Sequence, residues 1–179
     1  MPTSDTRAST SATTAAKERF LAVYDKEHAT TMRVLRAFPR DKTDLRPHEM
    51  IKSARELAWI FVLERGLGQH VFVDDLFAHG GPKEKPPAVP DSWDAVLDAV
   101  ETAHVELREK IRAMPDEEME KTVRFFVGPK MLDAIPRMEF LWFLLHDEIH
   151  HRGQFSVYLR MAGGKVPSIY GPTADEPWF

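Results

Sequence analysis

Hydrophobic residues recur three or four positions apart, the spacing of a helix, in four long segments of the chain. The first segment covers residues 15–38 and stops before Pro39, which does not easily continue a helix. The second begins at Ser53 and reaches about residue 76. Glu56 follows Ser53 at the spacing of a capping box, in which each side chain satisfies a free backbone N–H group. Both segments predict long amphipathic helices.

Two further helices are predicted in the second half of the chain. Asp91 follows a proline-rich linker and can cap a helix that reaches about residue 114. Pro136 suits the first turn of a last helix, which continues up to the glycine pair at 163–164. Between these helices, residues 121–127 have strand-like composition but are too short to found a sheet. The pattern predicts an all-α four-helix bundle with a long irregular connection before its last helix.

The chain of 179 residues has the length of one domain. Residues 1–14 are rich in serine and threonine and contain no apolar stretch. We therefore expect a disordered N-terminal tail over residues 1–14, without a secretory signal. Residues 15–179 are expected to form the single bundle domain, and a cytoplasmic location is the default expectation.

Composition argues against several classes of function. A net charge of −4, without any long run of Lys or Arg, argues against nucleic-acid binding. The longest wholly apolar runs are far shorter than the roughly 20 residues that a membrane span needs, so no membrane partner is expected. The chain has no cysteine, which excludes disulfides, thiolate ligands and a protein thiol nucleophile. Any thiol chemistry would therefore use a small-molecule thiol.

Two polar residues of the last predicted helix lie on its apolar face. Asp147 and His151 are one turn apart and fall within the apolar stripe of a helical wheel, whereas His146 and His150 fall beside it. An aspartate and a histidine at this spacing can bind one metal ion. We expect Asp147 and His151 to face the core, and the other two histidines to lie on the flank or surface.

The first two helices place two more polar side chains on apolar faces. Glu64 lies within the apolar stripe of the second helix, and His28 lies within that of the first. Burying such groups is costly unless they are paired, hydrogen-bonded or bound to a cation. Asp147, His151, Glu64 and His28 are therefore the candidate ligands of a divalent ion, which imidazole and carboxylate donors restrict to Zn, Ni, Fe or Mn. Taken alone, His28 is better explained as a hydrogen-bonded core histidine.

Metal-free interpretations account for the same residues. Glu64 can form a buried polar pair with His151, and Asp147 can form an ion pair with Arg124 or Arg137. A pair four residues apart on a helix is common without any metal. The remaining histidines outside the last helix show no ligand pattern and are expected on the surface: His48, His70, His79 and His104.

Three motifs resemble the DinB/YfiT-like family of helical bundles. They are His150-His-Arg-Gly-Gln154 in the last helix, Glu56-Leu-Ala-Trp59 in the second, and the C-terminal segment Gly164-Lys-Val-Pro-Ser-Ile-Tyr-Gly-Pro172. In that family the last helix usually carries His-x-x-x-His-Arg-Gly-Gln, and a histidine follows the tryptophan of the second helix. In this chain the three family positions hold Asp147, His151 and Ile60.

The resemblance implies an up-down-down-up bundle, frequent dimers, and a bound metal that acts with a low-molecular-weight thiol as cosubstrate. On this basis Asp147 and His151 hold the ion, and Glu64, one turn beyond Ile60, completes the site or takes the thiol proton. Tyr158 lines the substrate pocket. Glu64 and Tyr158 are thus the expected catalytic-site residues of a thiol transferase acting on a small electrophile. In a hydrolase variant, water replaces the thiol and Glu64 is the general base.

A non-catalytic protein is the alternative interpretation. A stress-associated and metal-free bundle could act by binding or as a structural protein. Ile60, in place of the family's usual histidine, favours this alternative. Glu64 and Asp147 on apolar faces favour the enzyme.

The back of the last helix predicts a homodimer. Four apolar side chains lie opposite the core stripe: Met138, Trp142, Leu145 and Ile149. A lone bundle would leave this strip in water, and two-fold pairing would cover it with Trp142 as the anchor. Alternatively, residues 121–127 or 178–179 cover the strip within a monomer.

Overall fold

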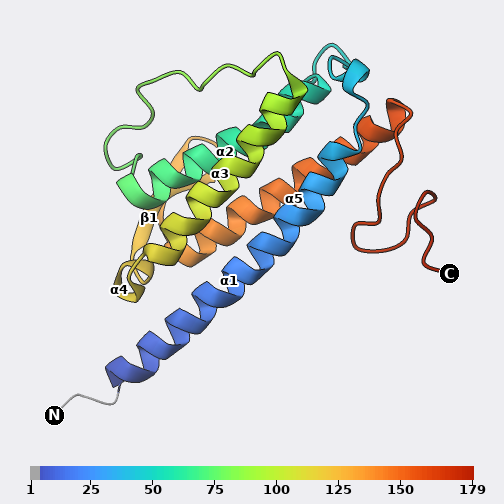
Figure 1. Cartoon of the computed structure of the whole chain (residues 1–179). Coiled ribbons are helices and arrows are strands. Elements are labelled where there is room, and N and C mark those ends of the chain that lie inside the picture. Colours follow the sequence, from blue (N-terminus) through green and yellow to red (C-terminus); the bar gives the residue numbers. More distant parts are fainter. Residues whose placement is uncertain (1–4) are drawn as a thin grey trace.

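The computed structural model describes the backbone of residues 5–179 and the side chains from residue 12 onward, and it is mostly helical (Figure 1). Within residues 5–179, none of the helices combines the length and the apolar character that crossing a membrane requires. Five α-helices, one 3-10 helix and two strands make up this described part of the chain: α1 (Asp5–Arg36), η1 (Arg40–Lys42), α2 (Ala54–Asp74), α3 (Trp93–Ala113), α4 (Asp116–Met119), β1 (Thr122–Gly128), β2 (Met131–Pro136) and α5 (Arg137–Met161).

The four long helices lie side by side. α1 and α5 run in one direction, and α2 and α3 run in the other (Figure 1). α2 packs against α3 and α5, and α1 packs against the same two helices. Because α2 and α3 are parallel, residues 75–92 cross from the end of α2 back to the level at which α3 begins. The helices enclose two clusters of buried apolar side chains.

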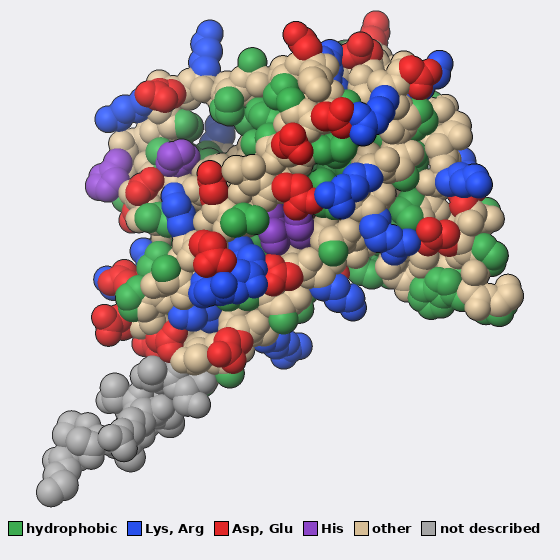
Figure 2. All heavy atoms as spheres, in the orientation of Figure 1, with side chains coloured by type: hydrophobic (Ala, Val, Ile, Leu, Met, Phe, Trp, Pro, Cys, Tyr) green, Lys and Arg blue, Asp and Glu red, His purple; other side chains and the backbone are tan. Residues whose placement is uncertain are grey.

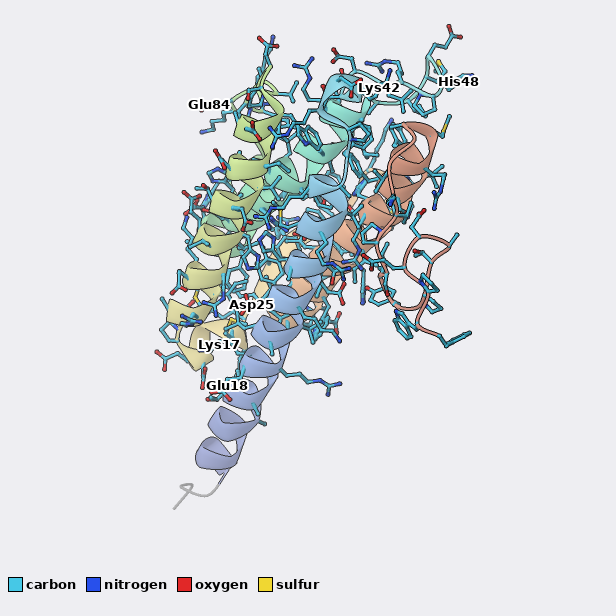
Figure 3. The ribbon with its side chains drawn as sticks, turned by 45° about the vertical axis from the view of Figure 1, so that its right-hand side comes forward. Lys17, Glu18, Asp25, Lys42, His48 and Glu84 are labelled. Carbon is cyan, nitrogen blue, oxygen red and sulfur yellow. The ribbon has the colours of Figure 1, made fainter. Side chains whose placement is uncertain are left out.

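α1 is longer than the sequence predicted. It begins at Asp5, inside the segment expected to be a disordered tail, while residues 1–4 of that segment lie outside the described part of the chain. The helical part of the segment contains neither glycine nor proline, so nothing in it stops a helix. Thr14 and Lys17 both contact Asp116 at the start of α4, Lys17 Nζ at 2.9 Å. Figure 3 shows Lys17 on the side of α1 that faces α3 and α4.

The helix caps agree with prediction for α2 and differ by one position for α3. Ser53 Oγ accepts from the Glu56 N–H, and Glu56 Oε2 accepts from the Ser53 N–H at 2.7 Å, which confirms the capping box. α3 is capped by Ser92, whose hydroxyl accepts from the Ala95 N–H, rather than by Asp91. Serine and aspartate suit this position equally, so their order in the sequence does not decide between them.

The connection before the last helix contains regular structure, contrary to prediction. It consists of α4 and an antiparallel hairpin in which Val123 of β1 pairs with Ile135 of β2. Val123 and Phe125 are buried, and Lys130 has the left-handed backbone (φ 59°) that the tight turn requires. Packing of its apolar face on the helices stabilises a pair of strands that would be marginal alone. Within residues 5–179, the longest irregular connection is the crossover of residues 75–92.

The apolar strip on α5 is covered within the same chain. Leu145 is buried, and Met138, Trp142 and Ile149 are partly buried against the core. Phe20 of α1 packs edge-on against Trp142, with ring centroids 5.2 Å apart. The expectation of an exposed strip is wrong because α5 packs against α1, α2 and the hairpin, so several of its faces are apolar. The homodimer receives no support from this strip and stays a prediction.

A buried ion pair between Arg65 and Glu148 joins all four long helices. Arg65 is 0% exposed, and its Nε and Nη2 donate to the two carboxylate oxygens of Glu148 on α5 at 2.9 and 2.7 Å. Its Nη1 donates to the Val100 carbonyl of α3 at 2.7 Å, and its guanidinium lies 5.8 Å from the ring centroid of Tyr24 on α1. The pair therefore fixes α2 against the other three helices.

A second buried arginine ties α5 to α1 and to the C-terminal segment. Arg152 Nη2 lies 2.7 Å from Glu27 Oε2 and donates to the Tyr170 hydroxyl at 2.7 Å. The same hydroxyl donates to Glu27 at 2.8 Å. The arginine of the last-helix motif and the tyrosine of the C-terminal motif thus belong to one structural network.

Acidic and basic side chains are interspersed on the face shown in Figure 2. Ion pairs join neighbouring elements on the surface, for example Arg36 with Glu101 at 2.5 Å and Arg33 with Glu176 at 2.8 Å. The face shown therefore offers no extended basic surface of the kind that binds a nucleic-acid backbone.

Replacing Glu148 with Leu should leave Arg65 buried without its charge partner. We expect the free energy of unfolding, measured by urea denaturation, to fall by about 3–5 kcal/mol. The double variant Arg65→Met/Glu148→Leu should recover most of this loss because it buries no unpaired charge. Arg40→Gln is the control, since the exposed Arg40–Asp94 pair should contribute less than about 1 kcal/mol. If Glu148→Leu is as stable as Arg40→Gln, the buried pair does not hold the helices together.

Candidate metal centre

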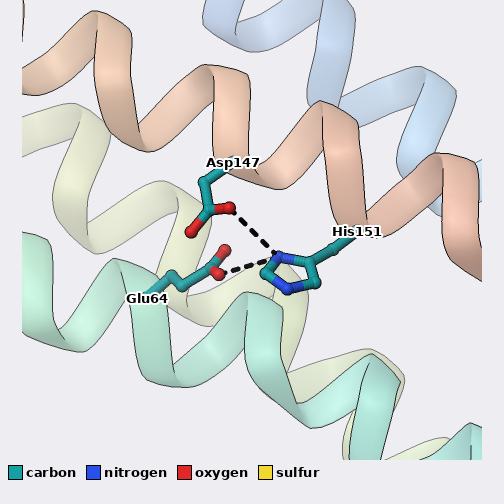
Figure 4. A group of neighbouring side chains, drawn as sticks. All are labelled: Glu64, Asp147 and His151. Atoms are coloured by element: carbon teal, nitrogen blue, oxygen red, sulfur yellow. Dashed lines mark ion pairs between the residues drawn. The ribbon is translucent and has the colours of Figure 1, made fainter. Parts of the chain in front are cut away.

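Three of the predicted ligands meet where α2 and α5 lie against each other (Figure 4). Glu64 comes from α2, and Asp147 and His151 come from adjacent turns of α5. His151 Nδ1 lies 2.8 Å from Glu64 Oε1 and 3.8 Å from Asp147 Oδ1. One donor atom from each residue lies within 4.8 Å of the others, so a single ion could contact all three. We call these three residues the α2–α5 cluster.

The α2–α5 cluster lies at the edge of the helix pair rather than inside the core. The exposed fraction of the side chain is 13% for Glu64, 19% for His151 and 38% for Asp147. The helical wheel therefore gave the correct direction for the two α5 residues, toward α2, but overstated their depth. His146 and His150 are both exposed and lie outside the cluster.

Burial and the contact between Glu64 and His151 shift the pKa values of both side chains. Burial, reinforced by the negative charges of Asp147 and Glu148, raises the pKa of Glu64 to about 7, although His151 opposes the shift. The contact with the Glu64 carboxylate in turn raises the pKa of His151. Both shifts favour the protonated form of the side chain, and a bound cation would compete with these protons.

Two buried atoms of the α2–α5 cluster have no hydrogen-bond partner. Glu64 Oε2 is one of them, and His151 Nδ1 is the other, because its short contact with Glu64 Oε1 lacks the direction of a hydrogen bond. Such atoms are costly to bury unless something satisfies them. An ion bound by one imidazole nitrogen and two carboxylates would use both, and this donor set suits Zn, Ni, Fe or Mn. The residues present therefore fit a divalent metal.

Only one of the two metal-free interpretations agrees with the structure. Within residues 12–179, the one ion-pair partner of Asp147 is His151, and neither Arg124 nor Arg137 takes part. Arg137 instead donates to a backbone carbonyl of α4 at 2.9 Å. The alternative pair of Glu64 with His151 is present as a 2.8 Å contact, so this interpretation stays open.

The structure does not bring His28 to the α2–α5 cluster. His28 lies between α1 and α3, where its ring stacks on that of His104 with centroids 3.8 Å apart and planes 5° from parallel. Its Nε2 lies 2.7 Å from Glu101, and His104 Nε2 lies 3.1 Å from Asp25, which is labelled in Figure 3 on the α3 side of α1. His28 is therefore a buried, hydrogen-bonded histidine rather than a ligand of this group.

The expectation that His104 lies in solvent is wrong, because its side chain is 7% exposed. The sequence contains the signal that would have placed it correctly. His104 continues a stripe of buried residues at helical spacing on α3: Leu97, Val100, His104, Leu107 and Ile111. His48, in contrast, lies at the outer edge of its loop, as expected (Figure 3).

Sequence reasoning also missed three buried charges that adjoin the α2–α5 cluster. Each cluster residue is followed in the chain by a buried charged residue, in the order Arg65, Glu148 and Arg152. A prediction that gives each helix one buried apolar stripe does not place these three residues in the core. α5 in fact buries a second row of side chains at helical spacing: Leu141, Leu145, Glu148, Arg152, Phe155 and Leu159.

An open cavity of about 920 Å³ lies beside the α2–α5 cluster. His151 belongs to both the cluster and the cavity wall. Tyr158 also lines the cavity, and its hydroxyl donates to the Lys52 carbonyl at 2.9 Å. Burial raises the pKa of Tyr158. A small molecule in this cavity would reach the cluster at His151.

These observations define a helical protein with a candidate metal centre between two helices. The chain matches the model of the DinB family over residues 9–177, and it therefore belongs to the DinB family. The resemblance carried by the motifs of α2, α5 and the C-terminal segment is thereby confirmed.

Proteins from Bacillus species match this chain over nearly their whole length. The uncharacterized protein YrdA of Bacillus subtilis (strain 168) is 26% identical over 160 residues, which cover 89% of this chain and 90% of YrdA. A DinB-like protein from Bacillus cereus ATCC 10987 has a TM-score of 0.68 at 23% identity, covering 86% of this chain and 97% of its own. The DinB-like protein YjoA of Bacillus subtilis has a TM-score of 0.65 at 16% identity, covering 84% and 97%. These two structures show the shared fold.

The stacked histidines should make the protein less stable in mild acid. Burial, the neighbouring His28 and the positive charge of Arg65 lower the pKa of His104 to about 3, and burial also lowers the pKa of His28. An unfolded histidine takes up its proton near pH 6.5. Between about pH 6.5 and pH 3 the unfolded chain therefore binds more protons, and stability falls as the pH falls. We expect the midpoint of thermal unfolding of the wild type, relative to that of a variant without His104 at the same pH, to decrease from about pH 7.5 to pH 5.

Two glutamine variants assign this pH dependence to the buried pair. His104→Gln keeps a polar side chain beside Asp25 and removes one titrating ring, so its thermal midpoint should change less with pH. His79→Gln alters an exposed histidine and should behave as the wild type. A pH dependence that is the same in His104→Gln and the wild type would contradict the role of this pair.

Proposed function

We propose that this DinB protein is an enzyme that binds one divalent ion through Glu64, Asp147 and His151. The ion would activate a low-molecular-weight thiol, or water, for attack on a small electrophile. The observation that carries the proposal is the α2–α5 cluster, which combines unsatisfied buried donor atoms with access to an open cavity. The long helices α1, α2, α3 and α5 would form the up-down-down-up four-helix bundle expected for the family, with the hairpin as an addition.

The three side chains would share ligand binding and proton transfer. His151 would bind in its neutral form, so binding of the ion would release the proton of the charged imidazole. Asp147 would supply a carboxylate ligand from the exposed side of the cluster. When bound, a divalent ion lowers the pKa of a coordinated thiol or water, so that the nucleophile is deprotonated near neutral pH.

Glu64 has the properties of a general base as well as those of a ligand. Without an ion, burial raises the pKa of Glu64 to about 7, so its carboxylate can accept and release a proton near neutral pH. The unpartnered Oε2 would bind the ion, which leaves the other carboxylate oxygen, Oε1, to take the proton. The nearby negative charges of Asp147 and Glu148 favour the protonated form.

The thiol branch of the proposal requires a small-molecule thiol, because the chain contains no cysteine. The cavity beside His151 would hold the electrophile, and Tyr158 would form part of its wall. The Tyr158 hydroxyl already donates to the Lys52 carbonyl, so we assign Tyr158 to substrate binding rather than to proton transfer. In the hydrolase branch, water takes the place of the thiol and Glu64 keeps its role.

A metal-free binding or structural protein is the second candidate. Ile60 favours it, since an apolar side chain stands where the family usually carries a histidine, and this side chain lines the cavity. The 2.8 Å contact of Glu64 with His151 also allows the two groups to neutralise each other without an ion. Metal content distinguishes the two candidates.

Untagged protein should contain about one divalent ion per chain by elemental analysis. His151→Ala should lose this ion because the variant removes the nitrogen ligand, whereas His146→Ala, an exposed histidine on the same helix, should keep it. Glu64→Gln should bind the ion more weakly and retain the helical circular-dichroism spectrum of the wild type. Equal metal content in the wild type and His151→Ala would refute binding at the α2–α5 cluster.

A further inference from the structure

The polar atoms of the aromatic residues that line the cavity are already engaged within the protein. Trp59 donates its indole N–H to the Pro87 carbonyl at 2.9 Å, and Tyr158 donates its hydroxyl to the Lys52 carbonyl at 2.9 Å. Both residues therefore offer a ligand their apolar rings and no free N–H or O–H donor.

The charged side chains that line the cavity balance one another. Arg46 Nη2 lies 2.7 Å from Glu56 Oε2, and Arg46 Nη1 donates to the Ile51 carbonyl. Lys52 and Glu49, both exposed, add one charge of each sign. Phosphate and nucleotide sites instead gather unpaired cations or free N–H groups. The balance of charges in this cavity favours an uncharged ligand.

Several apolar side chains that line the cavity are exposed. The exposed fraction is 81% for Met50, 41% for Ile51 and 58% for Val157, and Ile60 and Leu63 of α2 extend the same lining. Exposed apolar side chains that gather in a concave site are typical of ligand contacts. A volume of about 920 Å³ is that of a site for a small molecule.

We propose that the substrate of this site is an uncharged, mainly apolar small molecule. Its apolar body would lie against Ile60, Val157 and the ring of Trp59, and its reactive end would point toward His151, which the cavity shares with the α2–α5 cluster. The reaction at that end rests on the proposed function. Binding of the apolar body does not require a metal ion.

Two fluorescent probes that differ in one charged group test the chemical class of the ligand. N-phenyl-1-naphthylamine is neutral, and 8-anilino-1-naphthalenesulfonate has the same ring system with an added sulfonate. The wild type should bind the neutral probe more tightly than the anionic one. Tighter binding of the sulfonate, or no binding of the neutral probe, would overturn the proposal.

A matched pair of variants tests the location. Val157→Asp places a carboxylate in the cavity wall and should weaken binding of the neutral probe about tenfold or more. Val105→Asp makes the same change on α3, away from the cavity, at a valine that is 53% exposed compared with 58% for Val157. It should bind the probe as the wild type does. Equal probe affinity in the two variants would show that this cavity is not the binding site.

Metal content, measured on the same samples, separates this inference from the proposed function. Val157→Asp should keep the metal content of the wild type because Val157 is not part of the α2–α5 cluster. If the protein lacks metal but Val157→Asp alone loses the probe, the apolar site stands and the metal-dependent reaction fails. If metal is present and the two variants bind the probe equally, the proposed function stands and the proposal of an apolar substrate is contradicted.

Discussion

The buried ion pair of Arg65 with Glu148 is the interaction on which the rest of the structure depends. Two charges are tolerated away from water only when nearly every donor and acceptor has a hydrogen-bond partner. Here Arg65 of α2 bonds to α3 and α5 and lies near the ring of Tyr24 on α1. Such a pair permits little sliding of α2 along α5. Because Glu64 and Asp147 directly precede the paired residues in the chain, the same register brings them together.

Neighbouring residues in the chain thus divide structural and functional roles. Arg65, Glu148 and Arg152 point into the protein and join the helices, whereas the residue before each of them points toward the edge of the α2–α5 contact. The structural members are fully paired. Of the outer members, Glu64 and His151 have unsatisfied buried atoms and shifted pKa values, and His151 lines a largely apolar cavity that is open to solvent. This division explains how a half-buried candidate metal centre can lie at the surface of a tightly packed helical protein.

The sequence predicted the four long helices, the capping box of α2, and the three residues that meet in the α2–α5 cluster, because helical periodicity and the capping residues are local properties. The buried charges were not predictable in this way, since Arg65 and Glu148 are 83 positions apart and their pairing is a tertiary contact. The strip around Trp142 was misassigned because a helical wheel assumes one buried face, and α5 is covered from several sides. His104 could have been placed correctly from the apolar spacing of α3.

The most direct test of the account is the position of a metal ion in crystals of the wild-type protein grown with Zn²⁺, located by anomalous diffraction at the zinc edge. The account predicts one strong peak between Glu64, Asp147 and His151, at coordination distances of about 2.0–2.2 Å from nitrogen and oxygen ligands. Zinc bound only at the exposed His146 and His150, with Glu64 and His151 remaining in direct contact, would contradict it.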